Sequence, residues 1–130
     1  MAERRKILIA DDEASIREIL SIQLARMGYE VLIAADGAEA LAVYEQERPD
    51  LVILDVMMPR MNGLEACQKI RMLEKKGGVR VPILFLTARD TTHDKTSAAL
   101  SGGDDFVAKP VSLQELRERV EAALSRKAKP

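Results

Sequence analysis

The chain has 130 residues, 47% hydrophobic and 3% aromatic, and its 20 Lys and Arg against 21 Asp and Glu give a formal charge of −1. This length suits one domain with its own core, and the near-neutral charge argues against a nucleic-acid-binding protein. Cys67 is the only cysteine, which excludes an internal disulfide framework and favours a reducing cytoplasm. The apolar runs are too short for a membrane span, and no apolar segment follows the basic N-terminus as in a signal peptide. We therefore expect a cytoplasmic protein that binds neither membranes nor nucleic acids.

Apolar runs and helical periodicities alternate along the chain. Five short apolar runs predict strands, at residues 7–10, 31–34, 51–54, 83–86 and 106–108. Three of these runs are continuous and rich in leucine or β-branched residues, which is typical of strands buried on both faces of a parallel sheet.

The segments between the first strands carry apolar residues at helical spacing. In the first segment these are Ile16, Ile19, Leu20, Leu24 and Met27, and Gly28 stands where the helix should end. Asp36 is placed to cap a second helix, which Pro49 closes. In the third segment the apolar positions are Leu64, Cys67, Ile70 and Leu73, before the pair of glycines at 77 and 78.

The C-terminal part predicts two more helices. Residues 90–100 form the weakest one, because threonine and serine recur there and are poor helix formers. Ser112 and Glu115 make a capping box for the last helix, which is expected to bury Leu113, Leu116, Val120 and Leu124. Alternating strands and helices predict an α/β doubly wound sheet. We expect one domain over residues 1–126 and a frayed tail at 127–130.

Polar side chains follow four of the predicted strands. Asp11 and Asp12 come after the first strand, Asp55 after the third, Thr87 after the fourth and Lys109 after the fifth. The carboxyl ends of parallel strands line one edge of a sheet, so these residues should converge there. Crowded carboxylates repel one another, and Mg²⁺ is the hard cation that binds through few protein ligands plus waters. With an ammonium and a hydroxyl beside them, these groups suit phosphoryl transfer, in which an aspartate can be the nucleophile.

Each of these residues also has a simpler interpretation when taken alone. Asp11 or Asp12 could cap the first helix, and Asp55 could be an ordinary turn residue. Their joint occurrence at neighbouring strand ends favours a common site.

Four segments resemble those of the response-regulator receiver domains of two-component systems. They are residues 7–13 (ILIADDE), 55–63 (DVMMPRMNG), 86–88 (LTA) and 103–110 (GDDFVAKP). The segments follow the order and spacing of that family over essentially the whole chain.

This resemblance implies a fold, a reaction and a metal site. The fold is a flavodoxin-like (β/α)5 sheet of five parallel strands in the order 2-1-3-4-5. Asp55 accepts a phosphoryl group from a histidine kinase or phosphotransfer protein, so the chain is not an enzyme acting on other substrates and catalyses only its own phosphorylation and dephosphorylation. Asp11, Asp12, Asp55 and the backbone carbonyl of Met57 hold Mg²⁺.

The resemblance also implies how the phosphoryl group is sensed. Thr87 and Lys109 contact the phosphoryl oxygens, and Thr87 acts with the switch aromatic, Phe106. The Lys109–Pro110 bond is cis in the family. Val111 departs from the pattern, because many relatives carry phenylalanine there.

A possible dimer face rests on four charged residues. They resemble the pairs that receivers of winged-helix transcription regulators form across a two-fold axis, namely Lys95 with Glu115 and Asp105 with Arg119. The surface combines the fourth helix, the fifth strand and the fifth helix. At two of its positions, 96 and 118, this chain has Thr and Glu where relatives carry aliphatic or small residues. We therefore expect a weak, salt-sensitive homodimer on phosphorylation.

Three alternatives to a working receiver are distinguishable in the sequence. An aspartyl-phosphate phosphatase carries a second Asp two residues after the first, where this chain has Met57. A dinucleotide-binding domain needs a glycine-rich loop after the first strand, where this chain has Asp11-Asp12-Glu13. A degenerate receiver used only as a docking module would not need all five site residues.

Overall fold

The computed structural model describes residues 4–87 and 102–128 of the chain. Its strands are β1 (Lys6–Ala10), β2 (Glu30–Ala34), β3 (Leu51–Asp55), β4 (Ile83–Thr87) and β5 (Asp105–Ala108). Its helices are α1 (Ala14–Arg26), α2 (Gly37–Glu47), α3 (Gly63–Glu74) and α5 (Leu113–Ala128). The helix predicted at residues 90–100, and with it Lys95, lies outside the described residues.

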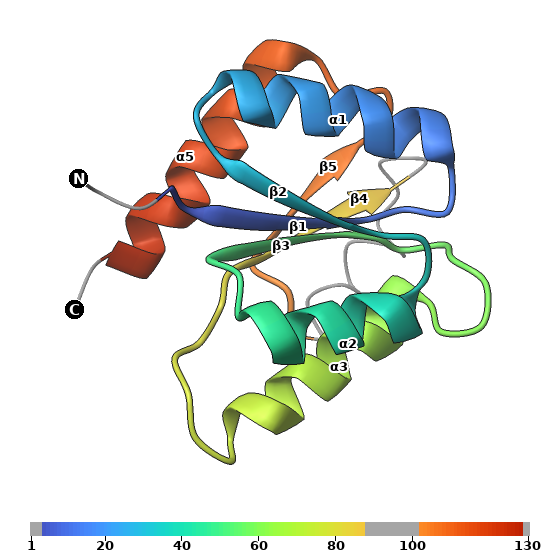
Figure 1. The fold of residues 1–130 in the computed structure, drawn as a ribbon, viewed down its shortest axis with the longest axis vertical. Helices are drawn as coiled ribbons and strands as arrows, with labels where there is room; N and C mark the ends of the chain where they lie inside the picture. The colour runs from blue at the N-terminus through green and yellow to red at the C-terminus, as the bar shows by residue number, and fades with distance from the viewer. Residues whose placement is uncertain (1–3, 88–101, 129–130) are drawn as a thin grey trace.

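The strands form one parallel sheet in the order β2-β1-β3-β4-β5 (Figure 1), which confirms the predicted fold class and strand order. Each strand is one residue longer than its predicted apolar run. The strands β1, β3 and β4 are almost entirely buried, as expected for the middle of a sheet covered on both faces.

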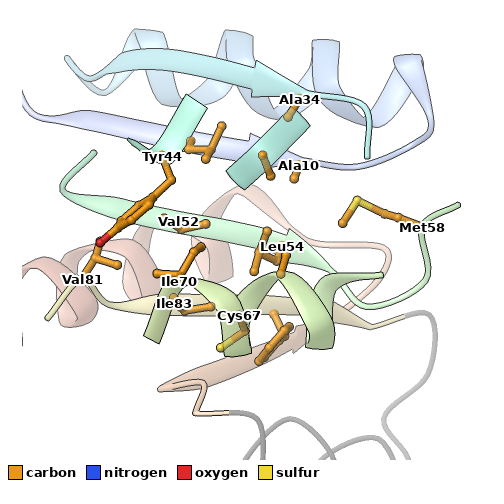
Figure 2. Packing of buried hydrophobic residues seen from close by; sticks show 14 of the residues in the cluster. Ala10, Ala34, Tyr44, Val52, Leu54, Met58, Cys67, Ile70, Val81 and Ile83 are labelled. Atoms are coloured by element: carbon orange, nitrogen blue, oxygen red, sulfur yellow. The ribbon is translucent and has the colours of Figure 1, made fainter. Parts of the chain in front are cut away.

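Helices cover both faces of the sheet, with α1 and α5 on one side and α2 and α3 on the other (Figure 1). Successive strand residues point to opposite faces, so each strand contributes to two cores. Ile7, Ile9 and Ile53 pack on the α1 and α5 side. Leu8 and Val52 pack on the α2 and α3 side, which also holds Tyr44, Cys67 and Ile70 (Figure 2).

Three of the described helices start at a residue whose side chain caps the helix N-terminus. Asp36 Oδ1 accepts a hydrogen bond from the backbone N–H of Glu39 (2.8 Å), as the sequence predicts. Asn62 Oδ1 caps α3 in the same way through the N–H of residue 65 (2.9 Å), and Ser112 Oγ caps α5 through the N–H of residue 115 (3.1 Å). The N-cap residue of α1 is Glu13, without a side-chain cap, so neither Asp11 nor Asp12 serves as its N-cap.

Two apolar side chains that were predicted to be buried are exposed in the structure. Leu113 is 45% exposed, because it stands in the first turn of α5, ahead of the segment from Leu116 to Leu124 that packs on the sheet. Ile19 is 52% exposed, because it is rotated by about 100° from Leu20, which takes the core-facing position.

The C-terminal helix continues to Ala128, two residues into the segment predicted as a tail. Within the part of the chain that the structure describes, no helix is both long enough and apolar enough to cross a bilayer.

Candidate functional site

An acidic cluster forms at the edge of the sheet where the strands end. Asp11 follows β1 directly, and Asp55 is the last residue of the neighbouring strand β3. Together with Asp12, each offers a carboxylate oxygen, and these oxygens all lie within 4.8 Å of one another. Asp11 and Asp55 are buried, with 0% and 4% exposure, whereas Asp12 is exposed to solvent.

One ammonium group lies between the two buried carboxylates. Lys109 follows β5, and its Nζ is 2.8 Å from Asp11 Oδ2 and 3.1 Å from Asp55 Oδ2. Glu13 Oε1 lies farther away, at 4.0 Å. Among the described residues, Lys109 therefore supplies one positive charge to the three clustered carboxylates, and these groups together carry an excess of negative charge.

The pKa values of the site reflect this excess. Burial, followed by repulsion from Asp11, raises the pKa of Asp55 to about 6, although Lys109 and the N–H of Met57 oppose the rise. Burial disfavours the charged form of Lys109, but its hydrogen bond to Asp11 and the attraction of Asp55 outweigh this and raise its pKa. Lys109 thus stays protonated, and the carboxylates need a further cation.

The donor set fits a hard divalent metal ion. Carboxylate oxygens are the ligands that Mg²⁺ prefers, and Mg²⁺ binds through few protein ligands with waters completing its shell. Asp11, Asp12 and Asp55 would supply such ligands from two strand ends. A divalent ion would also relieve the repulsion that raises the pKa of Asp55.

Thr87 carries a buried hydroxyl at the end of β4. The residue is 2% exposed, and its Oγ1 has no hydrogen-bond partner among the described residues. Its backbone carbonyl accepts a hydrogen bond from the N–H of Lys109 (2.7 Å), which holds β5 and its lysine beside this strand. Leaving a buried hydroxyl unpaired is unfavourable, so the Thr87 hydroxyl is available for an oxygen of a bound group.

Phe106 lies on β5, two register positions from Thr87. It pairs with Phe85, whereas Thr87 pairs with Ala108, so Phe106 and Thr87 are close on neighbouring strands. Phe106 is partly buried and packs against the core on the α2 and α3 side. The Lys109–Pro110 peptide bond, which follows this strand, is cis.

Two positions at the site require glycine because another segment of backbone lies too close for a Cβ atom, which sequence analysis did not reveal. A Cβ on Gly63, the first residue of α3, would overlap the carbonyl oxygen of Asp55 and lie 2.9 Å from its carbonyl carbon. A Cβ on Gly37 would likewise overlap the carbonyl oxygen of Met61. Glycine weakens a helix by roughly 0.5–1 kcal/mol relative to alanine. Its presence in the first turns of α2 and α3 was therefore the one sign in the sequence that these positions need a residue without a side chain.

Three charged residues of the predicted dimer face, Asp105, Glu115 and Arg119, lie among the described residues and pair within one chain. Arg119 Nη1 donates to both carboxylate oxygens of Asp105, at 3.0 Å each. Arg119 Nη2 lies 3.9 Å from Glu115 Oε2. In the single chain, the guanidinium of Arg119 is thus already engaged by Asp105.

Comparisons with known proteins agree with this geometry. The family model described as the response regulator receiver domain matches residues 7–121. The alkaline phosphatase synthesis transcriptional regulatory protein PhoP of Bacillus subtilis is 45% identical over 94% of this chain and 49% of its own length. The chain thus spans about half the length of the curated relatives it matches.

Solved structures give the same result. The chemotaxis protein CheY4 of Vibrio cholerae is 36% identical, with a TM-score of 0.86 over 93% of this chain and 99% of that one. A CheX–CheY–BeF₃–Mg²⁺ complex from Borrelia burgdorferi is 25% identical, with a TM-score of 0.83 over 91% of this chain and 87% of that one. A family match over most of its length, a shared fold and an acidic cluster at the sheet edge show that the chain belongs to the response regulator receiver domains of two-component signalling.

Proposed function

We propose that Asp55 accepts a phosphoryl group from a histidine kinase or phosphotransfer protein, in a reaction that requires Mg²⁺. The observation that carries this proposal is the meeting of Asp55 with Asp11, Asp12 and Lys109 at one sheet edge. The Borrelia burgdorferi CheX–CheY complex contains BeF₃ and Mg²⁺, which supports the proposal that this chain binds a phosphoryl group and a metal ion.

The chemistry is a displacement at phosphorus. With a pKa of about 6, Asp55 is mostly ionised at neutral pH, so a carboxylate oxygen can attack the phosphorus of a phosphohistidine. The new O–P bond forms as the N–P bond breaks, and the electron pair of that bond stays on the departing imidazole. Mg²⁺, when bound by Asp11, Asp12, Asp55 and the Met57 carbonyl, supplies positive charge that neutralises the phosphoryl oxygens.

Two side chains would act on the phosphoryl group directly. The Lys109 ammonium, 3.1 Å from Asp55 Oδ2, is placed to pair with a phosphoryl oxygen, and the unpaired Thr87 hydroxyl can donate to another. A movement of Thr87 toward the phosphoryl group would leave space beside β5 that Phe106 can enter. We propose that this movement carries the signal to the surface formed by β5 and α5.

The alternative of an aspartyl-phosphate phosphatase is less well supported. The residue two positions after Asp55 is Met57, which is 71% exposed and cannot protonate a leaving group. We therefore propose a receiver that catalyses reactions only on itself. The single cysteine of the chain, Cys67, is buried, which is compatible with work in the reducing cytoplasm.

Intact-mass measurement tests the proposal. Incubation with acetyl phosphate and Mg²⁺ should add one phosphoryl group to the wild type, and EDTA should prevent it. Asp55→Asn should stay unlabelled and Asp12→Ala should be labelled poorly. Asp50→Asn is the matched control, because Asp50 precedes the same strand at its opposite end and should leave labelling unchanged. Undiminished labelling of Asp55→Asn would exclude this site.

A further inference from the structure

The first turn of α2 contacts the loop that follows Asp55. The backbone N–H of Gly37 donates to the carbonyl oxygen of Met61 (3.0 Å). Beside this bond, Asp36 Oδ2 lies 3.3 Å from Arg60 Nε. Asp36 is 7% exposed and is fixed by capping α2 through its other oxygen, so it gives Arg60 a rigid partner.

Backbone hydrogen bonds also fix both ends of this loop, which comprises residues 56–62. The N–H of Val56 donates to the carbonyl of Leu86 (3.0 Å), and the N–H of Gly63 donates to the carbonyl of Val56 (3.1 Å). Met58 points from the loop into the core near Ala10 and Ala34 (Figure 2). Through residues 60 and 61, α2 thus supports the C-terminal half of the loop.

Met57 lies in this loop between the supported points. Its side chain is exposed, and its N–H donates to Asp55 Oδ1 (3.2 Å), so the position of the loop backbone is tied to the carboxylate. The proposed metal ligand at this residue is its backbone carbonyl, which can be placed only by the path of the loop itself.

We infer that Asp36 and Gly37 are positioning residues for the metal site. They hold the β3–α3 loop so that the Met57 carbonyl and Asp55 meet one ion, although α2 contributes no ligand. This inference rests on the proposed function, because it presupposes that the site binds Mg²⁺. Groups that orient metal ligands commonly change metal affinity when they are altered.

Gly37→Ala is the most direct perturbation. The added methyl group would overlap the Met61 carbonyl oxygen, which is backbone and cannot turn away as a side chain would. The loop must move by about 1 Å to restore ordinary contact distances. We expect the dissociation constant for Mg²⁺ to rise about 10-fold, the lower end of effects seen for groups that orient metal ligands.

Gly28→Ala is the matched control. Gly28 follows α1 and has a φ of +99°, and a methyl group added to it would meet no atom within 4 Å, so its substitution strains the backbone without a clash. It lies before β2, at the edge of the sheet opposite to the metal cluster. This variant should lose stability yet bind Mg²⁺ as the wild type does.

The experiment is a titration of the full chain with MgCl₂, followed by the amide resonances of residues 55–57 in NMR spectra, with thermal unfolding measured alongside. Weaker binding in Gly37→Ala and wild-type binding in Gly28→Ala would support the inference. Wild-type affinity in a folded Gly37→Ala protein would overturn it. If the wild-type protein itself binds no Mg²⁺, the proposed function fails instead.

A second set of variants keeps the test decisive if Gly37→Ala does not fold. Asp36→Asn retains an acceptor for the α2 cap but loses the charge facing Arg60, and Arg60→Ala removes the other partner. Each should raise the Mg²⁺ dissociation constant roughly two- to five-fold, and the double variant should do no more, because both act through one contact. Unchanged affinity in both single variants would overturn the inference.

Discussion

Replacing Asp55 with asparagine is expected to stabilise the unmodified protein at neutral pH. In the folded protein, burial and then repulsion from Asp11 raise the pKa of Asp55 from 3.8 to about 6, so the ionised carboxylate destabilises the fold. Asparagine removes this charge and can still accept one of the two hydrogen bonds, which reach Oδ1 from Met57 N–H and Oδ2 from Lys109 Nζ; its amide nitrogen cannot accept the other. Lys109 keeps its partner Asp11 at 2.8 Å, so the ammonium does not become unpaired.

The magnitude follows from the difference between the two pKa values. A change from 3.8 to about 6 corresponds to roughly 3 kcal/mol at pH values above both. Asp55 is only 4% exposed, so solvent screens this interaction little. This shift already includes the attraction of Lys109. The hydrogen bond that asparagine cannot accept reduces the net effect, and we expect a gain of about 1–3 kcal/mol in the free energy of unfolding.

The dependence on pH distinguishes this cause from a general packing effect. The folded state binds the Asp55 proton more tightly than the unfolded state does. Protonation of Asp55 therefore contributes fully to the free energy of unfolding below pH 3.8, and this contribution is lost as the pH rises through about 6. The difference between Asp55→Asn and the wild type should therefore be small near about pH 4 and largest above about pH 7.

Urea unfolding followed by far-UV circular dichroism, in EDTA, measures this difference at each pH. Addition of Mg²⁺ should stabilise the wild type and narrow the gap, because the ion neutralises the same repulsion. A variant no more stable than the wild type at neutral pH, or a gap that does not change with pH, would refute the reasoning.

Three further predictions concern the phosphorylated protein. Thr87→Ala should lose little stability, because its hydroxyl has no partner among the described residues, yet its NMR signals around Phe106 should no longer shift on phosphorylation; equal shifts in both proteins would contradict the switch. Met57→Asn should shorten the lifetime of the phosphoryl group measured by intact mass, because an exposed amide beside Asp55 can orient water; an unchanged lifetime would show that this position does not set the rate. The beryllofluoride-activated protein should dimerise weakly in sedimentation experiments at low salt and dissociate at high salt, because the Asp105–Arg119 ion pair must form between chains instead of within one. Arg119→Glu should abolish the dimer. An activated protein that stays monomeric at high concentration and low salt would exclude this dimer.

Local patterns were enough to predict the sheet. Runs such as residues 51–54 and 83–86 are apolar on both faces, which is typical of strands inside a covered parallel sheet, and each strand was located within one residue. The order of the strands came from the family resemblance and not from these runs. The acids could be assigned to one edge because parallel strands end at the same side.

Contacts between distant segments could not be predicted in this way. Whether Gly37 meets Met61 depends on how α2 and the β3–α3 loop approach each other, which no local pattern encodes. Arg71 is another case, because its guanidinium joins α3 to the Val81 carbonyl (2.7 Å) and to Asp104 (2.9 Å). In the sequence it is an ordinary helix arginine, and its partners lie up to 33 residues away.

Chemical trapping of the modified residue tests the central claim most directly. Borohydride reduces the acyl phosphate of a phosphorylated aspartate to an alcohol, which leaves homoserine at the modified position. After phosphorylation by acetyl phosphate or a histidine kinase in Mg²⁺, peptide mapping by mass spectrometry should find homoserine at position 55 alone. Homoserine at another aspartate, or an unreduced Asp55 in fully phosphorylated protein, would contradict the account.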